Sequence, residues 1–213
     1  MKKMIGFFLI SLASVATNAQ TNLPVCIKAS FGYSKVKNNV NPTSSGFTYG
    51  VGVETFLSLS PKEKQFLLNP SLDYNSTGYE VSASFATNTD QVKVNYVVLA
   101  MPVVFNGNPH LFEKESNSLL IGIGPFVGFA TSGKFNTKAN SDYTKMSFGN
   151  DITANRKAVD AGITFKLGVT MGKTCFNIQK NTGLMNVMPK ERISNGEYIR
   201  TKIFMFQVTY KIN

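Results

Sequence analysis

Few residues of this 213-residue chain have the side chains that enzymes use for acid, base or nucleophilic chemistry. There is one histidine, His110, and the 12 Asp and Glu residues show no paired spacing. A Ser-His-Asp triad needs a histidine beside its nucleophile, and zinc sites usually draw on several His or Cys ligands. Because His110 falls in a predicted loop, we interpret it as a solvated surface imidazole. The sequence therefore predicts a non-enzymatic protein with no catalytic residue, no metal site and no cofactor.

Two cysteines, Cys26 and Cys175, are the other reactive side chains. An even number of cysteines in an exported protein invites a disulfide. Both fall in predicted strands with their side chains toward the lumen, but a third strand separates these two in an eight-stranded ring. Their Cα atoms then lie roughly 10 Å apart, two strand spacings, which exceeds the ~7 Å that a disulfide spans. This geometry disfavours a bridge, although the cysteine count leaves it open.

Charged residues also occur at polar positions within the predicted strands, and they comprise as many cations as anions: Lys28, Glu54, Asp73, Lys93, Asp160 and Lys166. Buried charges are tolerated when they are paired. Antiparallel pairing could set Lys28 opposite Glu54 and Asp73 opposite Lys93. We expect these residues to form a structural charge network that closes the lumen. The alternative is a narrow ion path, since eight strands leave room only for side chains or one small ligand.

About eight segments with alternating apolar and small polar residues would position these side chains. Strict alternation gives a strand one apolar and one polar face, and residues 158–171 show it most clearly, with Ile163 on one face and Lys166 on the other. The expected strands are 25–34, 46–58, 64–75, 91–105, 118–130, 158–171, 174–184 and 199–212. In 91–105, the apolar face expected to point outward carries Val92, Val94, Tyr96, Val98 and Ala100.

The connections between these segments alternate in length. Only Gly172-Lys173 separates the sixth from the seventh segment, a glycine-first pair typical of a two-residue hairpin turn, which would pair Val169 with Phe176. The connections after the first, third, fifth and seventh segments are mostly longer than the others. Long loops at one end, with short turns and both chain ends at the other, are the layout of transmembrane barrels.

The residues on the polar faces indicate which face points to the lumen. These faces hold mainly Gly, Ser, Thr and Asn, which suits a crowded lumen. Outward aromatic residues then form two girdles, with Tyr33, Phe47, Tyr49, Tyr74 and Phe129 nearer the long loops and Phe66 and Tyr210 nearer the turns. We predict an all-β fold, a closed up-and-down antiparallel transmembrane β-barrel of about eight strands. A soluble exported barrel is the alternative.

The first residues resemble an export signal. Lys2 and Lys3 precede an apolar stretch over 4–15 and the small residues Ala16, Thr17 and Ala19. The stretch is shorter than the ~20 residues of a spanning helix. We expect residues 1–19 to be a cleaved secretory signal peptide and residues 20–213 a single barrel domain in the cell outer membrane. Both ends of the barrel chain would be periplasmic.

The formal charge is +10, and many of the cations fall in predicted loops. They show no cluster with interleaved aromatic residues, so we expect no nucleic-acid partner. We expect contact with outer-membrane lipid, including the phosphates of lipopolysaccharide, and a monomeric barrel. The alternative is a merely solvated basic surface. The loop cations include Lys35, Lys37, Lys134, Lys138, Lys145, Arg156, Lys157, Lys190 and Arg192.

Three prolines fall inside predicted strands, where a missing ladder donor should produce bulges: Pro70, Pro102 and Pro125. The stretches around them, 68–74, 101–105 and 122–128, together with 183–187 and in this order, resemble the PorT-like outer-membrane β-barrel family. This resemblance implies a small eight-stranded barrel, mostly without assigned activity, in a family whose namesake is linked to protein secretion across the outer membrane. The chain departs from the family at Ser71, where Glu is frequent, and at Asn213, where an aromatic residue is usual, and no functional residue is carried over.

Together these features predict a structural or interaction role, with the long basic extracellular loops as the contact surface. Segment 131–157, rich in Ser, Thr, Asn and Lys, is the foremost candidate, and a protein partner would bind there. The alternatives are a narrow, porin-like channel, a carrier of one small ligand, or an accessory to protein secretion across the outer membrane.

Overall fold

The computed structural model describes residues 24–38, 43–59, 65–82, 89–107, 117–137, 143–151, 153–190 and 198–212. Residues 1–19, assigned to the signal peptide, and His110 lie outside these ranges. Within the described parts, no helix has the length and apolarity needed to cross a membrane.

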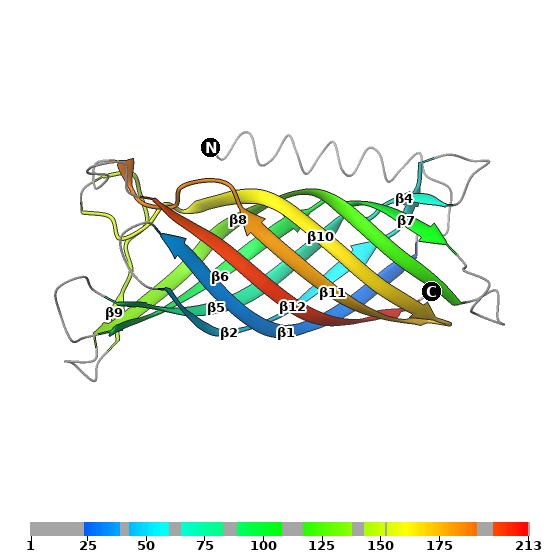
Figure 1. Cartoon of the computed structure of the whole chain (residues 1–213), viewed down its shortest axis with the longest axis horizontal. Helices are drawn as coiled ribbons and strands as arrows, with labels where there is room; N and C mark the ends of the chain where they lie inside the picture. Colours follow the sequence, from blue (N-terminus) through cyan, green and yellow to red (C-terminus); the bar gives the residue numbers. More distant parts are fainter. Residues whose placement is uncertain are drawn as a thin grey trace.

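Eight long strands make up most of the described chain: β1 (Val25–Asn38), β2 (Thr43–Thr55), β5 (Ser71–Ser82), β6 (Thr89–Ala100), β8 (Asn117–Thr137), β10 (Val159–Met171), β11 (Thr174–Gly183) and β12 (Ile199–Lys211). Four short strands accompany them: β3 (Leu57–Ser58), β4 (Phe66–Leu68), β7 (Val103–Gly107) and β9 (Thr144–Lys145). β3, β4 and β7 lie toward the turn end of the barrel, and β9 lies at the long-loop end (Figure 1).

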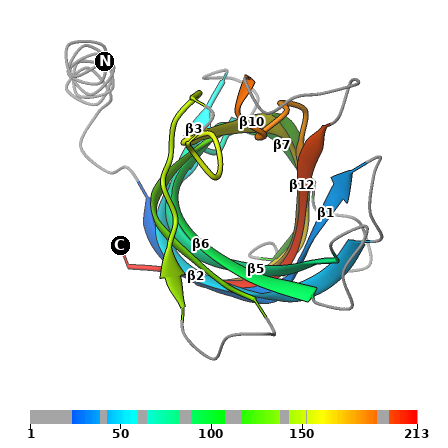
Figure 2. The ribbon, with the colours of Figure 1, turned by 90° about the vertical axis from the view of Figure 1, so that its left-hand side faces the viewer.

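The long strands form a closed ring, seen from the long-loop end in Figure 2. Their order is β10-β11-β12-β1-β2-β5-β6-β8, and β8 pairs with β10 to close it. Every one of these pairings is antiparallel. The predicted fold, a closed antiparallel barrel of eight strands, is confirmed.

The two-residue turn has the predicted register. Val169 pairs with Phe176, and Met171 pairs with Thr174. Gly172 has φ of +60°, a conformation that a residue with a side chain rarely adopts. The turn therefore aligns the faces of β10 and β11, because a one-residue slip would reverse every side chain.

Two of the three prolines interrupt strands, and the register shifts at none of them. Pro70 lies between β4 and β5, and Pro102 lies between β6 and β7, whereas Pro125 stays within β8 opposite Ile163. Each proline carbonyl still accepts a backbone hydrogen bond, over 2.9–3.1 Å, from Thr55 of β2 or from Asn69 or Met101, which lie just after β4 and β6. The register shifts occur elsewhere, in the β2–β5 and β6–β8 pairs. Because proline lacks only the donor, the ladder continues through its carbonyl.

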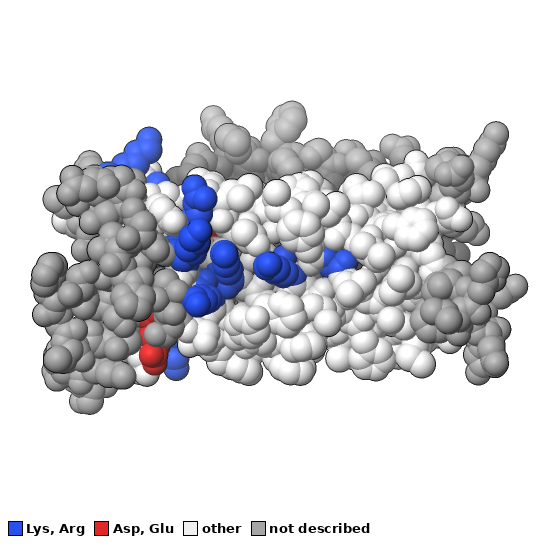
Figure 3. All heavy atoms as spheres, viewed as in Figure 1, with Lys and Arg blue, Asp and Glu red and all other residues white. Residues whose placement is uncertain are grey.

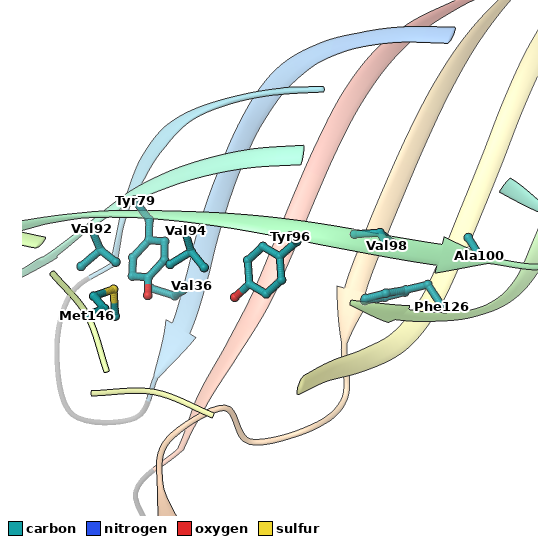
Figure 4. Close-up of a cluster of buried hydrophobic side chains, with 9 residues drawn as sticks. All are labelled: Val36, Tyr79, Val92, Val94, Tyr96, Val98, Ala100, Phe126 and Met146. Carbon is teal, nitrogen blue, oxygen red and sulfur yellow. The ribbon is translucent and has the colours of Figure 1, made fainter. Parts of the chain in front are cut away.

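The outward faces are apolar and aromatic, as predicted for most strands. The seven predicted girdle residues are 44–62% exposed, and the alternate positions of β1, β5, β10, β11 and β12 are mostly buried and mostly polar. Strand β6 is the exception, and its prediction was wrong. Its inward residues are Val92, Val94, Tyr96, Val98 and Ala100, all buried (Figure 4).

The reversal of β6 has a packing cause. Val97 and Leu99 are apolar on the other face of the strand, so alternation does not distinguish the two sides of its C-terminal half. In the folded barrel, the inward face packs with Val36, Phe126 and Met146 into one cluster. Burial of these side chains away from water favours the observed orientation, and the polar residues of β6, including Lys93, face outward.

Candidate functional site

The lumen contains a chain of ion pairs between opposite walls of the barrel. Lys166 Nζ of β10 lies 2.7 Å from Glu54 Oε2 of β2, and β2 is four strands from β10 around the ring. Lys28 Nζ lies 3.5 Å from the same Glu54 oxygen and 2.8 Å from Asp73 Oδ1. None of these four side chains is more than 4% exposed. Two cations and two anions thus form a neutral crossing of the lumen.

Gly52 allows the Lys28 side chain to reach Asp73. Along the register, Lys28 lies opposite Gly52, and Gly52 lies opposite Asp73. Gly52 has no side chain, so the Lys28 side chain passes over it to Asp73. A Cβ at this position would overlap Asp73 Oδ1 and lie 2.6 Å from the Leu72 carbonyl oxygen.

Neutral side chains complete the network. Lys166 Nζ donates to Asn69 Oδ1 at 2.9 Å, and the Asn69 amide donates to the Thr55 carbonyl oxygen at 2.8 Å. Ser71 Oγ donates to Asp73 Oδ2 at 3.2 Å. Buried charges are costly unless their remaining hydrogen-bonding capacity is used. Asn69 was missed as a site residue, although it belongs to the proline-containing stretch that the sequence singles out.

Two of the six predicted network residues lie elsewhere. Asp160 is buried, but its Oδ2 accepts a hydrogen bond from Thr201 Oγ1. Lys93 is exposed on the outer face of β6, with Nζ 5.4 Å from the centre of the Tyr143 ring. The expected pairing of Asp73 with Lys93 is wrong, because Asp73 lies opposite Val98 and β6 presents its other face to the lumen. Lys28 contacts Glu54 diagonally, since Cys26 is the residue opposite Glu54.

A second group of side chains fills the lumen toward the long-loop end. The cluster in Figure 4 joins β6 to Val36, Tyr79, Phe126 and Met146. Arg156 is also inside, 3% exposed, where its Nη1 donates to the Tyr79 hydroxyl. Its guanidinium carbon lies 5.5 Å and 5.7 Å from the ring centres of Tyr79 and Tyr96. Cation–π contacts of this kind strengthen when they are desolvated.

Arg156 and Met146 belong to the connection between β8 and β10, which was predicted to be a solvated contact loop. That prediction is wrong for its second half, because Met146, Ala154 and Arg156 are buried. Ser147 and Asn155 hydrogen-bond across this segment at 2.8–3.3 Å and hold it as a compact turn. No local sequence signal distinguishes Arg156 from the exposed cations near it.

The connection between β11 and β12 anchors this turn. The backbone N–H of Lys157 donates to the Val187 carbonyl oxygen at 2.8 Å, and Lys157 Nζ donates to the Asn186 carbonyl oxygen at 2.9 Å. Asn186 Oδ1 accepts from the N–H groups of Met188 and Ile199. Burial, and then the charge of nearby Lys190, lower the pKa of Lys157. The 183–187 stretch therefore joins two long connections at one end of the barrel.

A cavity of about 580 Å³ opens at the turn end. Cys26, Cys175, Phe56 and Leu120 are among its lining residues, and Lys173 and Lys211 also contribute. Both cysteines are free and buried, and β12 lies between their strands as predicted. None of the six predicted network residues lines this cavity. Among the described residues, no three His, Cys, Asp or Glu side chains group as metal ligands.

Comparison with known proteins gives one family match. A family model described as "Outer membrane protein beta-barrel domain" matches residues 18–188, and no curated protein sequence matches the chain. Among solved structures, the chain is similar to Neisserial surface protein A, with 7% identity over 88% of this chain and 97% of that one and a TM-score of 0.50. Ail, the attachment invasion locus protein of Yersinia pestis, has 10% identity over 90% of this chain and 100% of that one, with a TM-score of 0.39. The likeness to the Neisserial protein concerns the fold alone.

Proposed function

Because the chain belongs to the outer membrane protein β-barrel domain family, we propose that it is a non-enzymatic structural or interaction protein of the outer membrane. Its lumen is closed to solutes, and its long-loop end faces outward as the contact surface. The observation that carries this proposal is the filling of the lumen by buried side chains at two levels.

The two levels act in series along the barrel. Toward the long-loop end, the cluster around Val94 and Tyr96 packs with Arg156 and Met146. Closer to the turns, the Lys166–Glu54 pair joins opposite walls, and the Lys28–Asp73 pair continues the network along one wall. Eight-stranded barrels have an interior just wide enough for side chains. Both observations support a plugged barrel over the narrow-channel alternative.

The exposed part of the long-loop end has the composition of a contact surface. Tyr143 is 39% exposed, and its ring centre lies 4.4 Å from Lys134 Nζ and 5.4 Å from Lys93 Nζ. Tyrosine is one of the residues enriched at protein–protein hot spots. Lys145 of β9 is also exposed. These features support an interaction with a protein at the cell surface.

The lumen part of the proposal is tested in planar bilayers. The full chain, refolded and inserted, is expected to give no conductance steps above the bilayer leak. The double variant Arg156→Ala with Tyr96→Ala removes side chains from the cluster near the long-loop end only. Its lumen is also expected to stay closed, because the ion pairs nearer the turns remain. Steps from the unaltered protein would overturn the plugged barrel.

The contact part is tested by chemical crosslinking on intact cells that display the full chain. We expect a crosslinked partner with the unaltered protein and its loss with Tyr143→Ala combined with Lys134→Gln. The matched control replaces two turn-end residues, Lys173→Gln and Lys211→Ala, and is expected to keep the partner. Equal crosslinking by all three proteins would contradict this contact surface.

We also propose the finer assignment to the PorT-like family, with a role as an accessory to secretion. The stretches that resemble this family have defined structural parts here: Asn69 in the charge network, Pro70 and Pro102 in the interrupted strands, and Asn186 in the anchor. If the assignment is right, cells without this protein lose exported proteins from their medium, and the full chain restores them. Unchanged secretion in cells without this protein would contradict a role in secretion.

A further inference from the structure

Five cations lie on the outer wall of three neighbouring strands, toward the long-loop end. We call them the basic strip: Lys35 and Lys37 of β1, Arg200 and Lys202 of β12, and Lys180 of β11. All five are exposed. Figure 3 shows Lys and Arg side chains extending from the long-loop end along this face, with Asp or Glu side chains visible at the lower left of the view.

The register places like charges directly opposite one another. Lys35 pairs with Lys202, and Lys37 pairs with Arg200. Like charges in such positions destabilise an antiparallel pair. Among the described residues, none of the five has a carboxylate oxygen within 4.0 Å. The strip therefore lacks a described anion from its own chain that would offset the repulsion.

An aromatic ladder continues the strip toward the turn end. On β1 and β12, the next outward pair after Lys35 and Lys202 is Tyr33 with Phe204, whose ring centres are 5.3 Å apart. Phe31 and Phe206 follow, stacked at 5.8 Å. Aromatic girdles mark the membrane interfaces of outer-membrane barrels. Cations immediately beyond the girdle lie at the depth of lipid headgroups.

Lys180 extends the strip along the apolar wall. It lies opposite Phe204 on β12 and Phe165 on β10. A lysine can lay its methylene stem along apolar surface while its ammonium group reaches a polar region. Its position on the third strand widens the strip into a site flanked by aromatic rings, which suits a ligand with both phosphates and acyl chains.

We propose that the basic strip binds a phosphorylated glycolipid of the outer leaflet, the lipopolysaccharide class, through its phosphates. Arg200 offers two parallel N–H donors to one phosphate, and Lys35, Lys37 and Lys202 supply point charges around it. The acyl chains lie on the Tyr33–Phe204 and Phe31–Phe206 pairs. This site rests on one part of the proposed function, the outward orientation of the long-loop end.

The test measures binding of diphosphorylated lipid A to the purified full-length barrel in phosphatidylcholine nanodiscs. The strip variant replaces Lys35, Arg200 and Lys202 with Gln. The matched control replaces Lys93, Lys134 and Lys145 with Gln. It removes the same number of positive charges, and these lysines also lie opposite one another, Lys93 with Lys134 and Lys134 with Lys145. We expect the strip variant to bind at least about tenfold more weakly, since each cation near an anionic surface contributes appreciably, and the control to change less than about twofold.

Dephosphorylated lipid A and inorganic phosphate separate the sources of binding. We expect weak binding of the dephosphorylated lipid and no displacement of lipid A by millimolar inorganic phosphate. Equal loss in both variants would reduce the effect to net charge and overturn the site, and full displacement by phosphate would make it an anion site instead of a lipid site. Each variant is checked for folding by its gel mobility before heating, and single Lys202→Gln serves if the triple variant does not fold. Crosslinking through Tyr143 is read separately, so the protein-contact proposal can fail while the lipid site stands.

Discussion

Glu54 is the residue on which the lumen network depends. Its Oε2 atom lies within 3.5 Å of both Lys28 and Lys166, and its side chain is fully buried. Removing one member of a buried ion pair leaves an unpaired charge, which costs more than replacing the pair with apolar groups. At this scale, stability depends on charge balance more than on any single contact.

We expect Glu54→Gln to destabilise the folded barrel by about 3–5 kcal/mol, because two ammonium groups lose their shared partner. The double variant Glu54→Gln with Lys166→Met should be more stable than Glu54→Gln alone, since it removes Lys166, which loses its carboxylate partner, whereas Lys28 keeps Asp73 at 2.8 Å. Urea unfolding in detergent micelles, followed by gel mobility before heating, measures both. A double variant that loses the sum of the two single effects would mean that the residues are not coupled.

The two thiols should react according to their place in the turn-end cavity. Cys26 and Cys175 both line this space and are free. We expect a small methanethiosulfonate reagent to modify both in the folded barrel, and a bulky maleimide polymer to modify neither until the barrel is unfolded. Mass spectrometry counts the adducts. A mass lower by two hydrogen atoms, with no adduct after unfolding, would indicate a disulfide instead.

Strand β6 differs from its neighbours because it carries apolar residues on both faces. Its inward side packs with side chains from β1, β5 and β8 and with Met146 of the long connection. That connection is held in turn by Asn186 and Val187. Strand β6 and these two connections therefore close the interior toward the long-loop end.

The orientation of β6 predicts unequal effects at neighbouring positions. Val94 has no exposed surface, whereas Val97 lies on the outer face and is partly exposed. We expect Val94→Ala to cost about 2 kcal/mol, since it leaves a cavity in a packed cluster, and Val97→Ala to cost less than half of that. Unfolding midpoints in urea compare the two variants. A larger loss of stability in Val97→Ala than in Val94→Ala would indicate the opposite orientation of the strand.

The whole molecule is a sheet without free edges over its long strands, with apolar side chains outside and a filled interior. Closure pairs the backbone groups between strands, which is the requirement for crossing a bilayer with strands. The outward aromatic and aliphatic residues give the ring an apolar outer surface, as a lipid-facing wall requires. The family match and the closed ring agree on a barrel of the outer membrane.

At this scale we expect heat-modifiable mobility. The unheated protein in dodecyl sulfate should migrate faster than the boiled protein, because the closed hydrogen-bonded ring stays folded in the detergent. The protein should also fractionate with outer membranes and require detergent for extraction. A product that stays in the aqueous fraction and does not shift would contradict a transmembrane barrel.

Local pattern alone determined the long strands, the Gly172-Lys173 turn and the outward apolar faces of every long strand except β6, because alternation and a glycine-first turn act between near neighbours in the chain. It also identified Lys28, Glu54, Asp73 and Lys166 as residues that the structure buries together. Only the tertiary structure decided their partners, the orientation of β6, the insertion of Arg156 and the alignment of the basic strip. These depend on the register around a closed ring and on competition for space in the lumen, which couple residues far apart in sequence. A strand with two apolar faces is the clearest case, because its own residues do not say which side the other strands will bury.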